Sequence, residues 1–263
     1  MAITTFDGFI GSSKQYLSIA KTASRTSVAS SWFTVFDQAG NPGAGTLAGT
    51  STTAGVVPTD ATAGFPAIDA FGGSATGYLA QVDFGSSVAC RMKLFDCVFK
   101  AGAYAFNANT ALSAQPSYAS RMPGGSYGDT QIWLEQVTAG TGIQNVAVTY
   151  TNQAGTGSRS TGTVATAVNI AGRMWQLPLQ AGDTGVQKID NVTGSVATVG
   201  TFNILVLRPL WSGRVKIAND GDVHDLAKTG MPVLFADSAI MLAVAADSTA
   251  TGIPEIEMVI ANG

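Results

Sequence analysis

Ser126 is the residue whose surroundings come closest to a catalytic motif. It lies in Gly124-Gly125-Ser126-Tyr127-Gly128, which fits the G-x-S-x-G pattern of hydrolase nucleophiles. That pattern works where a strand enters a sharp turn before a helix, because this geometry lifts the serine hydroxyl toward a histidine. Here Met122-Pro123 precedes the motif and a predicted strand follows it. We predict no catalytic residue and no enzyme, although Asp190 and His224, the single histidine, could formally complete a hydrolase triad.

The densest polar cluster is Asn219-Asp220-Gly221-Asp222-Val223-His224-Asp225. Calcium takes six to eight oxygen ligands, which an aspartate-rich turn can supply. The cluster lacks the D-x-D-x-D-G order and the distal glutamate of the usual calcium loop. We predict a solvated turn whose aspartates bond to their own backbone, with enough negative charge to meet a basic partner.

Two cysteines, Cys90 and Cys97, lie in one predicted strand. Seven steps along a strand separate them by about 23 Å and place them on opposite faces, which excludes a disulfide between them. Two cysteines and one histidine also make no metal-ligand cluster. Glycine-rich runs are present without the G-x-x-x-x-G-K-[ST] pattern of phosphate loops. We therefore predict two buried thiols in a reducing cytoplasm, no metal and no cofactor.

Four tryptophans could stack on sugars, as in a carbohydrate-binding sandwich: Trp32, Trp133, Trp175 and Trp211. Each lies within or beside an apolar segment, so packing in a core is the interpretation we favour.

The elements that must position these residues fall into three segments: residues 1–36, 37–77 and 78–263. In the first, apolar residues between Ser12 and Phe36 recur at three- and four-residue steps without Pro or Gly, which predicts one broken helix or two short ones. The second is rich in Gly, Thr and Pro and lacks periodicity. Such long segments are often functional, so we predict an extended arm that orders on a neighbouring subunit, with a mobile surface loop as the alternative.

The third segment predicts short strands rich in Val, Ile, Thr and aromatic residues. They are 78–84, 88–99, 131–137, 143–151, 162–170, 174–179, 201–207, 214–218, 231–235, 240–245 and 255–260. Strands follow strands with no helical units between them, which favours antiparallel pairing. The predicted fold is mainly β: an antiparallel β-sandwich or jelly-roll-like body, as one large or two small sandwiches, with a short N-terminal helical segment and a long Gly-rich arm.

Charge and hydropathy limit the partners. Only 12% of the 263 residues are charged and the net charge is -3, which excludes a basic nucleic-acid binder. No apolar run approaches the ~18 residues of a membrane helix, and no secretory signal is visible. A monomer kept soluble by its own surface carries ~25–35% charge there. We therefore expect a structural subunit whose surface is largely covered by copies of itself.

Four stretches resemble a family of tailed-bacteriophage virion structural proteins, which includes minor capsid, cement and decoration components. They are Met1-Ala2-Ile3-Thr4-Thr5-Phe6-Asp7-Gly8, Ser30-Ser31-Trp32-Phe33-Thr34-Val35-Phe36, Ala39-Gly40-Asn41-Pro42-Gly43-Ala44-Gly45 and Gly55-Val56-Val57-Pro58-Thr59-Asp60-Ala61. The resemblance covers about the first 70 residues and supplies no catalytic or ligand residue. It implies a place in the virion, a homotrimer at local three-fold positions of the shell, and synthesis in the bacterial host cytoplasm.

The leading hypothesis is a non-enzymatic virion protein that stabilises the capsid by bridging major capsid subunits. The contacts are expected in the N-terminal segment and the Gly-rich arm, at Phe6, Phe9, Trp32, Phe33, Phe36, Pro42, Pro58 and Phe65. A β body that folds without residues 1–73 is part of this hypothesis. The alternatives are a glycan- or receptor-binding sandwich at the virion surface and a tail structural protein.

Overall fold

The computed structural model describes residues 3, 5–72, 76–167, 169–195 and 199–263. The chain is mainly β with antiparallel pairing, and a short N-terminal helix is present, as predicted. Met1, Ala2 and Thr4 of the phage-like stretches, and residues 73–75 of the Gly-rich segment, lie outside the described residues.

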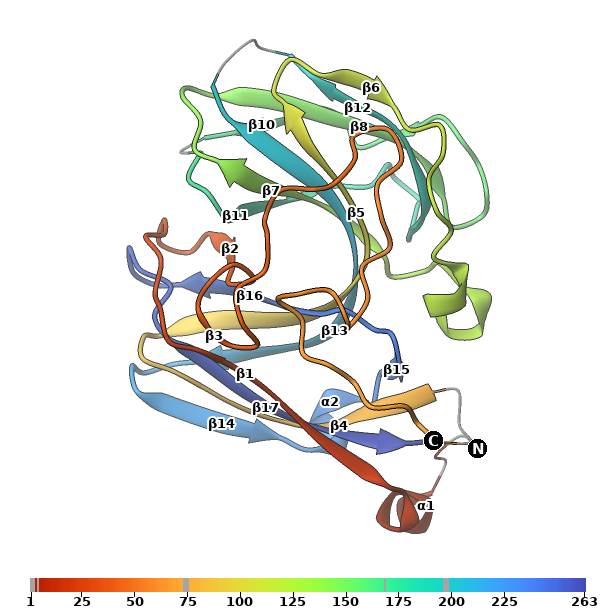
Figure 1. Ribbon diagram of the computed structural model, residues 1–263, viewed down its shortest axis with the longest axis vertical. Helices are drawn as coiled ribbons and strands as arrows, with labels where there is room; N and C mark the ends of the chain where they lie inside the picture. Colours follow the sequence, from red (N-terminus) through yellow and green to blue (C-terminus); the bar gives the residue numbers. More distant parts are fainter. Residues whose placement is uncertain (1–2, 4, 73–75, 168, 196–198) are drawn as a thin grey trace.

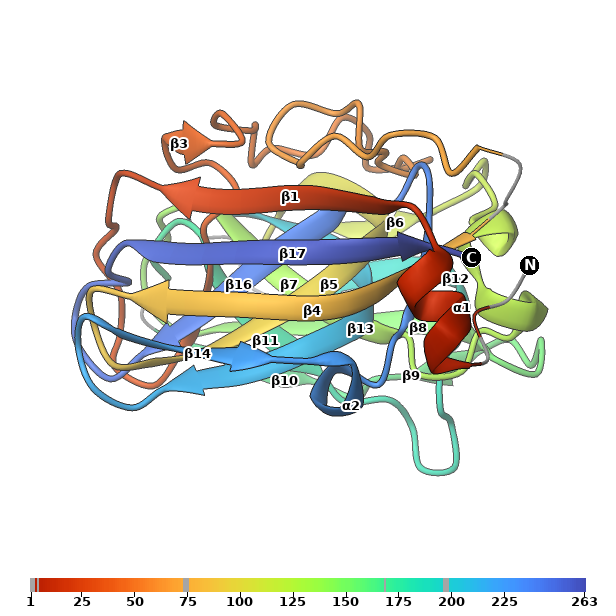
Figure 2. The ribbon, with the colours of Figure 1, turned by 90° about the horizontal axis from the view of Figure 1, so that it is seen from below.

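One sheet has six strands in the described residues (Figure 2). Its order is β14 (Asp220–His224), β4 (Thr76–Ser86), β17 (Pro254–Asn262), β1 (Lys14–Lys21) and β3 (Gly40–Asn41), with β15 (Val233–Phe235) also paired to β4. All of these pairs are antiparallel. Because β14 stands at one end of the order, it is an edge strand of the sheet.

A closed barrel lies beside this sheet (Figure 1). Its strands, in order, are β11 (Arg173–Leu177), β2 (Trp32–Thr34), β16 (Ile240–Ala246), β5 (Cys90–Ala105), β13 (Thr201–Val215) and β7 (Gln131–Thr138). A third sheet covers the far side and contains β10 (Val164–Thr166), β8 (Gln144–Asn152), β12 (Val186–Gly194) and β6 (Asn109–Ala111), with β9 (Arg159–Ser160) paired to β8. The helical elements are α1 (Phe6–Gly11), α2 (Leu226–Thr229), η1 (Ala119–Arg121) and η2 (Pro123–Gly125).

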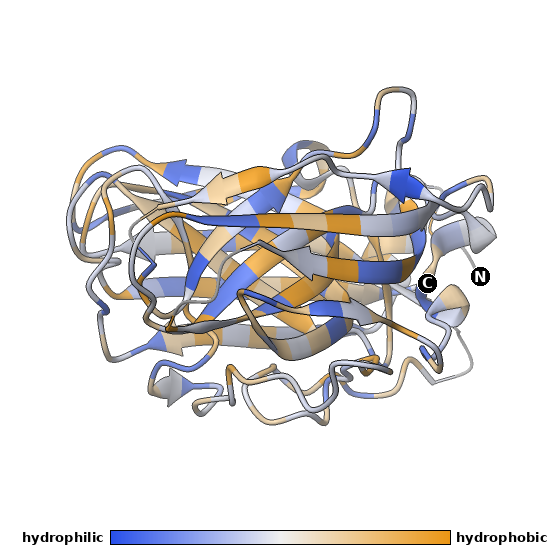
Figure 3. Cartoon of the chain, turned by 90° about the horizontal axis from the view of Figure 1, so that it is seen from above, coloured by the Kyte–Doolittle hydropathy of each residue, from blue (hydrophilic) through white to orange (hydrophobic). Residues whose placement is uncertain are grey.

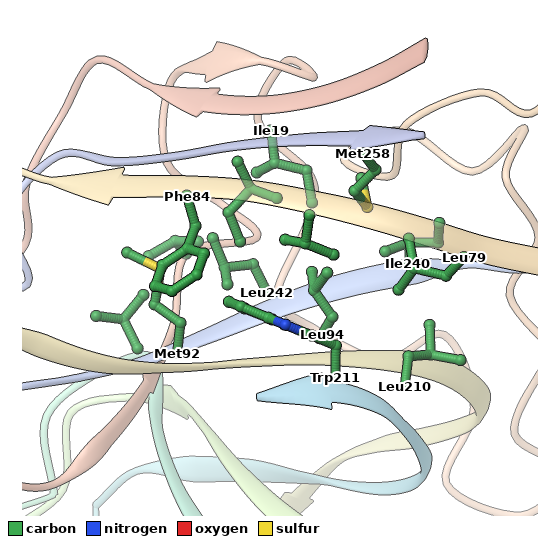
Figure 4. Packing of buried hydrophobic residues seen from close by; sticks show 14 of the residues in the cluster. Ile19, Leu79, Phe84, Met92, Leu94, Leu210, Trp211, Ile240, Leu242 and Met258 are labelled. Atoms are coloured by element: carbon green, nitrogen blue, oxygen red, sulfur yellow. The ribbon is translucent and has the colours of Figure 1, made fainter. Parts of the chain in front are cut away.

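Three hydrophobic cores follow from this arrangement. The first lies between the six-stranded sheet and the barrel and includes Leu79, Phe84, Leu94 and Trp211 (Figure 4). The second lies between the barrel and the third sheet and includes Phe202. The third fills the barrel interior with side chains such as Phe95, Cys97, Trp133, Met174, Leu205 and Met241. In Figure 3 hydrophobic residues, in orange, recur along the central strands.

The long strands β5 and β13 join the two halves of the molecule. The first half of β5 packs in the first core and its second half in the second core. Their mutual register shifts at three places, two of which flank the pair of Asp96 and Arg208. Bulges bend a strand and increase its twist. Each long strand can therefore pack against the six-stranded sheet along one half and against the third sheet along the other, and we call these two packed halves of the molecule the two sandwiches.

Asp96 is fully buried at this bend and binds two arginines. Its carboxylate accepts hydrogen bonds from Arg121, from Arg208 at 3.0 Å and from the Ser238 hydroxyl at 3.0 Å. Arg121 also donates to the carbonyl oxygen of Pro58 in the Gly-rich segment. One buried carboxylate thus connects β5, β13, η1, the loop before β16 and residues 37–72.

The helix predicted between Ser12 and Phe36 is wrong. Helix α1 ends at Gly11, and β1 and β2 occupy the predicted range. Ile19 and Lys21 of β1 are buried on one face while Tyr16 is exposed on the other, which is the two-residue alternation of a strand. Pairing with β17 over seven registered positions satisfies the backbone of β1. This tertiary pairing overrides the weak helical periodicity of a Ser- and Thr-rich stretch.

The separable Gly-rich arm is also wrong for the described residues 37–72, because they pack on their own chain. Leu47, Phe65, Ile68 and Phe71 are buried. The backbone of Val56 exchanges two hydrogen bonds with Lys100 of β5, at 2.8 and 2.9 Å. A β-carbon at residue 49 would lie only 2.6 Å from the backbone nitrogen of Gly102. Glycine here permits close packing of two backbones, so residues 37–72 belong to the body of the molecule.

Most predicted strands are confirmed. The ranges 201–207 and 214–218 belong to one long strand, β13, which ends at Val215. The predicted strand 162–170 shortens to β10, and its residue 168 lies outside the described residues. Sequence reasoning missed the strands β1, β2, β3, β6, β9, β12 and β14. Strand β14 occupies most of the polar cluster predicted as a turn. In the described residues, no helix has the length and apolar character needed to cross a membrane.

Candidate interaction surfaces

The eight predicted contact residues separate into exposed and buried groups. Phe6 is 63% exposed. Phe9, Trp32 and Pro42 are half-buried. Phe33, Phe36, Phe65 and Pro58 are buried in this chain's own core, so they are not available to a partner in this conformation. The aromatic rings of Phe36 and Phe65 instead contact each other, with centroids 4.6 Å apart at the barrel interior.

Helix α1 projects from the start of β1, near the C-terminus of the chain (Figure 2). Thr5 caps its start, since the Thr5 hydroxyl oxygen accepts a hydrogen bond from Gly8 N at 3.0 Å. Lys14 caps its end by donating to the carbonyl oxygens of Phe9 at 2.9 Å and Ile10 at 3.2 Å. None of its residues is buried, and Phe6 and Ile10 are 63% and 60% exposed. The helix therefore presents an apolar surface without covering it.

The outer face of the six-stranded sheet carries three carboxylates, which we call the acidic face: Asp83 on β4 and Glu255 and Glu257 on β17. Asp83 and Glu257 are direct cross-strand partners, and Glu255 lies two residues before Glu257. All three are exposed, and among the described residues none of them forms an ion pair. They line a hollow of about 520 Å³ that reaches edge strand β14 at Asp220.

A second hollow, which we call the basic groove, is lined by Arg91 and Lys93 of β5, Arg214 of β13, and Lys216. It has a volume of about 620 Å³ and also includes Trp32 and, from β14, Asp222 and His224. Arg91 and Arg214 are direct cross-strand partners. The groove holds four of the chain's 14 basic residues.

The positive charge of the basic groove is only partly compensated. Arg214 lies 3.7 Å from Asp247, and this pair is exposed. Arg91 donates to the carbonyl oxygen of Ser30 at 3.1 Å, and Lys93 lies 5.0 Å from the ring centroid of Trp32. In the part of the chain that the structure describes, Arg91, Lys93 and Lys216 form no ion pair. Burial and the neighbouring Arg91 lower the pKa of Lys93. An anionic group would therefore be stabilised here.

The structure does not bring together the residues of the formal catalytic triad. Ser126 follows the short helix η2 rather than a strand, and its hydroxyl oxygen accepts a hydrogen bond from Gly128 N at 3.4 Å. His224 Nδ1 accepts a hydrogen bond from Trp211 Nε1 at 2.9 Å, beside the ring of Phe84. Asp190 lies 3.1 Å from Lys188. Each side chain is occupied by partners outside the triad.

The two cysteines and the possible metal ligands are the remaining candidates from the sequence. Cys90 and Cys97 are free and buried, as predicted, and burial raises the pKa of Cys97 to about 12. Among the described residues, no three His, Cys, Asp or Glu side chains are grouped to hold a metal ion.

The tryptophans are divided between the core and its margin. Trp133 and Trp211 are buried. Trp32 and Trp175 are half-buried, with Lys93 over one ring and Arg173 over the other. The favoured interpretation of core packing holds for the first two, and cations occupy positions over the rings of the others.

Sequence reasoning missed both charged surfaces, although a signal for them was present. Arg91 and Lys93 alternate with Met92 and Leu94, and Glu255 and Glu257 alternate with Ile256 and Met258. Like charges at alternate positions of a strand lie on one face of the sheet. What the sequence did not show is which strands are neighbours, and this pairing adds Arg214 and Asp83 to the two surfaces.

Comparisons with known proteins give no family assignment. No family model and no curated protein matches the chain. Matches among solved structures include the VP2 protein of infectious bursal disease virus in derived T=1 particles, with 10% identity over 95% of this chain and 77% of that chain, at a TM-score of 0.18. The Gx strain of the same virus matches with 10% identity over 95% of this chain and 80% of that one, at a TM-score of 0.17. Similarity at this level does not establish a shared fold or function.

Proposed function

We propose that this chain is a non-enzymatic structural protein of a tailed-bacteriophage virion that stabilises the capsid by bridging major capsid subunits. The observation that carries the proposal is the scarcity of charge on the surface. Six of the 31 charged residues are buried, namely Lys21, Asp96, Lys100, Arg121, Glu135 and Arg208. Only 25 remain for the surface of a 263-residue chain. Because charged residues are depleted at the centres of protein interfaces, such a surface suits a subunit that is covered after assembly.

Helix α1 is the contact element that we assign to the capsid. A six-residue helix is too short to be stable alone in water, and α1 has no buried residue of its own. Burying Phe6 and Ile10 against another protein would remove both apolar side chains from water, which contributes about 1.5–3 kcal/mol for each. The resemblance of the first residues to phage virion proteins also points to this end of the chain.

The test uses the double variant Phe6→Ser/Ile10→Ser and phage capsids that lack this chain. We expect the variant to lose at least tenfold in capsid binding, measured by co-sedimentation, while its thermal unfolding stays near that of the wild type because neither residue is buried. Ile143→Ser is the matched control, since Ile143 is equally exposed at 64% but precedes β8 in the third sheet. Unchanged capsid binding by a folded double variant would contradict the assignment of α1. Absence of wild-type binding would contradict the proposed function.

A further inference from the structure

Both charged surfaces place like charges directly opposite each other across a strand pair. Arg91 opposes Arg214 in the basic groove, and Asp83 opposes Glu257 on the acidic face. Like charges in directly opposite positions destabilise a sheet. Each surface therefore carries a repulsion that a bound group of opposite charge would relieve.

The two charge patterns also share their spacing. In each, two charged residues are cross-strand partners, with β-carbons about 4.5–5.5 Å apart. A third lies two residues along one strand, about 6.6–6.8 Å away: Lys93 beside Arg91, and Glu255 beside Glu257. Three cations and three anions are thus laid out on the same antiparallel lattice. One chain carries both patterns, so a second copy of this chain offers a partner of matching charge and spacing.

We infer that the basic groove of one molecule binds the acidic face of a second copy of this chain. The two surfaces belong to different sides of edge strand β14. Val223 pairs with Asp83 and shares the face of the acidic side chains, whereas Asp222 and His224 of the basic groove pair with the buried Phe84 and Val82 and lie on the other face. One molecule can therefore use both surfaces at once, each with a different neighbour.

The arrangement that follows is head-to-tail. A two-fold dimer through either surface would place carboxylate against carboxylate or cation against cation, which costs several kcal/mol in an interface. A head-to-tail contact closes into a ring if its rotation allows, and otherwise continues as a filament. The expected homotrimer is one such ring. The inference rests on the proposed role as an assembling subunit and specifies the surfaces through which the subunits join.

The experiment is a charge swap in the full chain, with molar mass measured by size-exclusion chromatography and light scattering. The basic variant is Arg91→Glu/Arg214→Glu and the acidic variant is Asp83→Lys/Glu257→Lys. We expect the wild type to associate at low salt and to weaken as salt increases, because exposed charge pairs are screened. Each double variant should fall to the 26.8 kDa of a single chain. The four-residue variant, which combines all four substitutions and so reverses both surfaces, should regain the wild-type mass.

Recovery of the wild-type mass in the four-residue variant would show that the double variants lose association through their charge and not through unfolding. Lys188→Glu is the matched control, since its side chain is 52% exposed on β12, away from both surfaces, and it should leave the mass unchanged. Thermal unfolding checks that each variant is folded. A wild type that stays a single chain at low salt, or folded double variants that keep the wild-type mass, would overturn the inference. A folded four-residue variant that fails to associate would also overturn it.

The outcome is also distinguishable from that of the proposed function. A double charge variant that is a single chain and still sediments with capsids supports both the surfaces assigned here and the separate role of α1. A wild type that forms salt-sensitive oligomers but does not bind capsids supports the head-to-tail contact and contradicts the capsid role.

Discussion

Asp96 shows how a single carboxylate can organise a large β structure. It is buried with Arg121 and Arg208, and it also accepts a hydrogen bond from Ala239 N at 3.1 Å. Burying such charges is costly, so a buried ion pair is weak evidence for net stability. Its more direct effect here is on geometry, because the bonded groups come from five separate parts of the chain and meet at the bend of β5 and β13.

We expect Asp96→Asn to destabilise the protein strongly. The substitution keeps the shape of the side chain but leaves two buried arginines without their counter-charge, which typically costs about 3–5 kcal/mol. Urea unfolding followed by circular dichroism measures the change. Asp247→Asn is the control: its exposed pair with Arg214 predicts a change of at most about 1 kcal/mol. Equal effects of the two substitutions would contradict the role assigned to Asp96.

Asp183 predicts a loss of stability in acid. Arg159 Nε donates to its carboxylate at 2.8 Å, and Asn152 and Tyr150 each donate at 2.7 Å. The hydrogen bond from Arg159 is the main cause that lowers the pKa of Asp183 to about 2, against about 3.9 in an unfolded chain. A lowered pKa means that the unfolded chain takes up the proton first. The stabilisation is therefore complete above pH ~4 and is lost as the pH falls toward ~2.

Thermal unfolding between pH 5 and pH 2 tests this. The Asp183→Asn variant should melt at a lower temperature than the wild type at pH 5, and the difference should shrink as the pH falls toward 2. Asp69→Asn is the comparison, since Asp69 is exposed and its substitution should leave the pH dependence of the wild type intact. A difference between Asp183→Asn and the wild type that stays constant over this range would refute the assignment.

At the scale of elements, the Gly-rich segment is held by close packing and by buried polar contacts. Lys100 donates to the carbonyl oxygen of Thr46 at 3.1 Å, and Gly49 N donates to Asn203 Oδ1 at 3.0 Å. Asn203 also donates to Glu135 Oε2 at 2.8 Å, and all of these side chains are buried in the barrel wall. The segment lies across the barrel, where Phe36, Leu47 and Phe65 contribute to the interior.

Gly49→Ala should therefore loosen this segment. The added β-carbon would lie 2.6 Å from Gly102 N, a backbone atom that cannot move away cheaply. Overpacking of this kind typically costs about 1–3 kcal/mol. We expect a lower urea midpoint and faster cleavage within residues 37–72 by a protease of broad specificity. Gly43→Ala is the control, because a β-carbon there meets nothing within 4 Å. Slow cleavage of both variants would show that the segment tolerates the contact.

The limits of sequence reasoning can be traced to particular elements. Strand β8 could be predicted because its buried residues alternate with half-buried ones, and β7 because polar and apolar residues alternate along its sequence, although most of its side chains are buried. The Gly-rich segment could not, because its lack of periodicity is the same whether it packs on its own chain or on another. Strand β1 was mistaken for a helix because its backbone partner, β17, lies more than 230 residues away in the sequence. The charged surfaces depend on cross-strand neighbours, which a single sequence does not reveal.

At the scale of the whole molecule, the two sandwiches share their central strands. Strands β5 and β13 pair along most of their lengths and supply side chains to all three cores. The chain between them supplies the third sheet, and the two ends of the chain supply the six-stranded sheet through β1 and β17. Neither sandwich can be cut from the other without cutting these strands, so we expect the molecule to unfold as one unit.

Substitutions in the cores of the two halves test whether the molecule unfolds as one unit. Leu79→Ala affects the first core and Ile189→Ala the second, and both side chains are fully buried. Each substitution should cost about 2–5 kcal/mol. If the long strands couple the halves, either substitution lowers the free energy of global opening and therefore reduces amide protection in both. Hydrogen exchange measured on peptides from β8 and β12 in Leu79→Ala, and from β4 and β17 in Ile189→Ala, should show faster exchange than in the wild type. Faster exchange confined to the substituted half would mean that each sandwich opens separately and that the shared strands do not couple them.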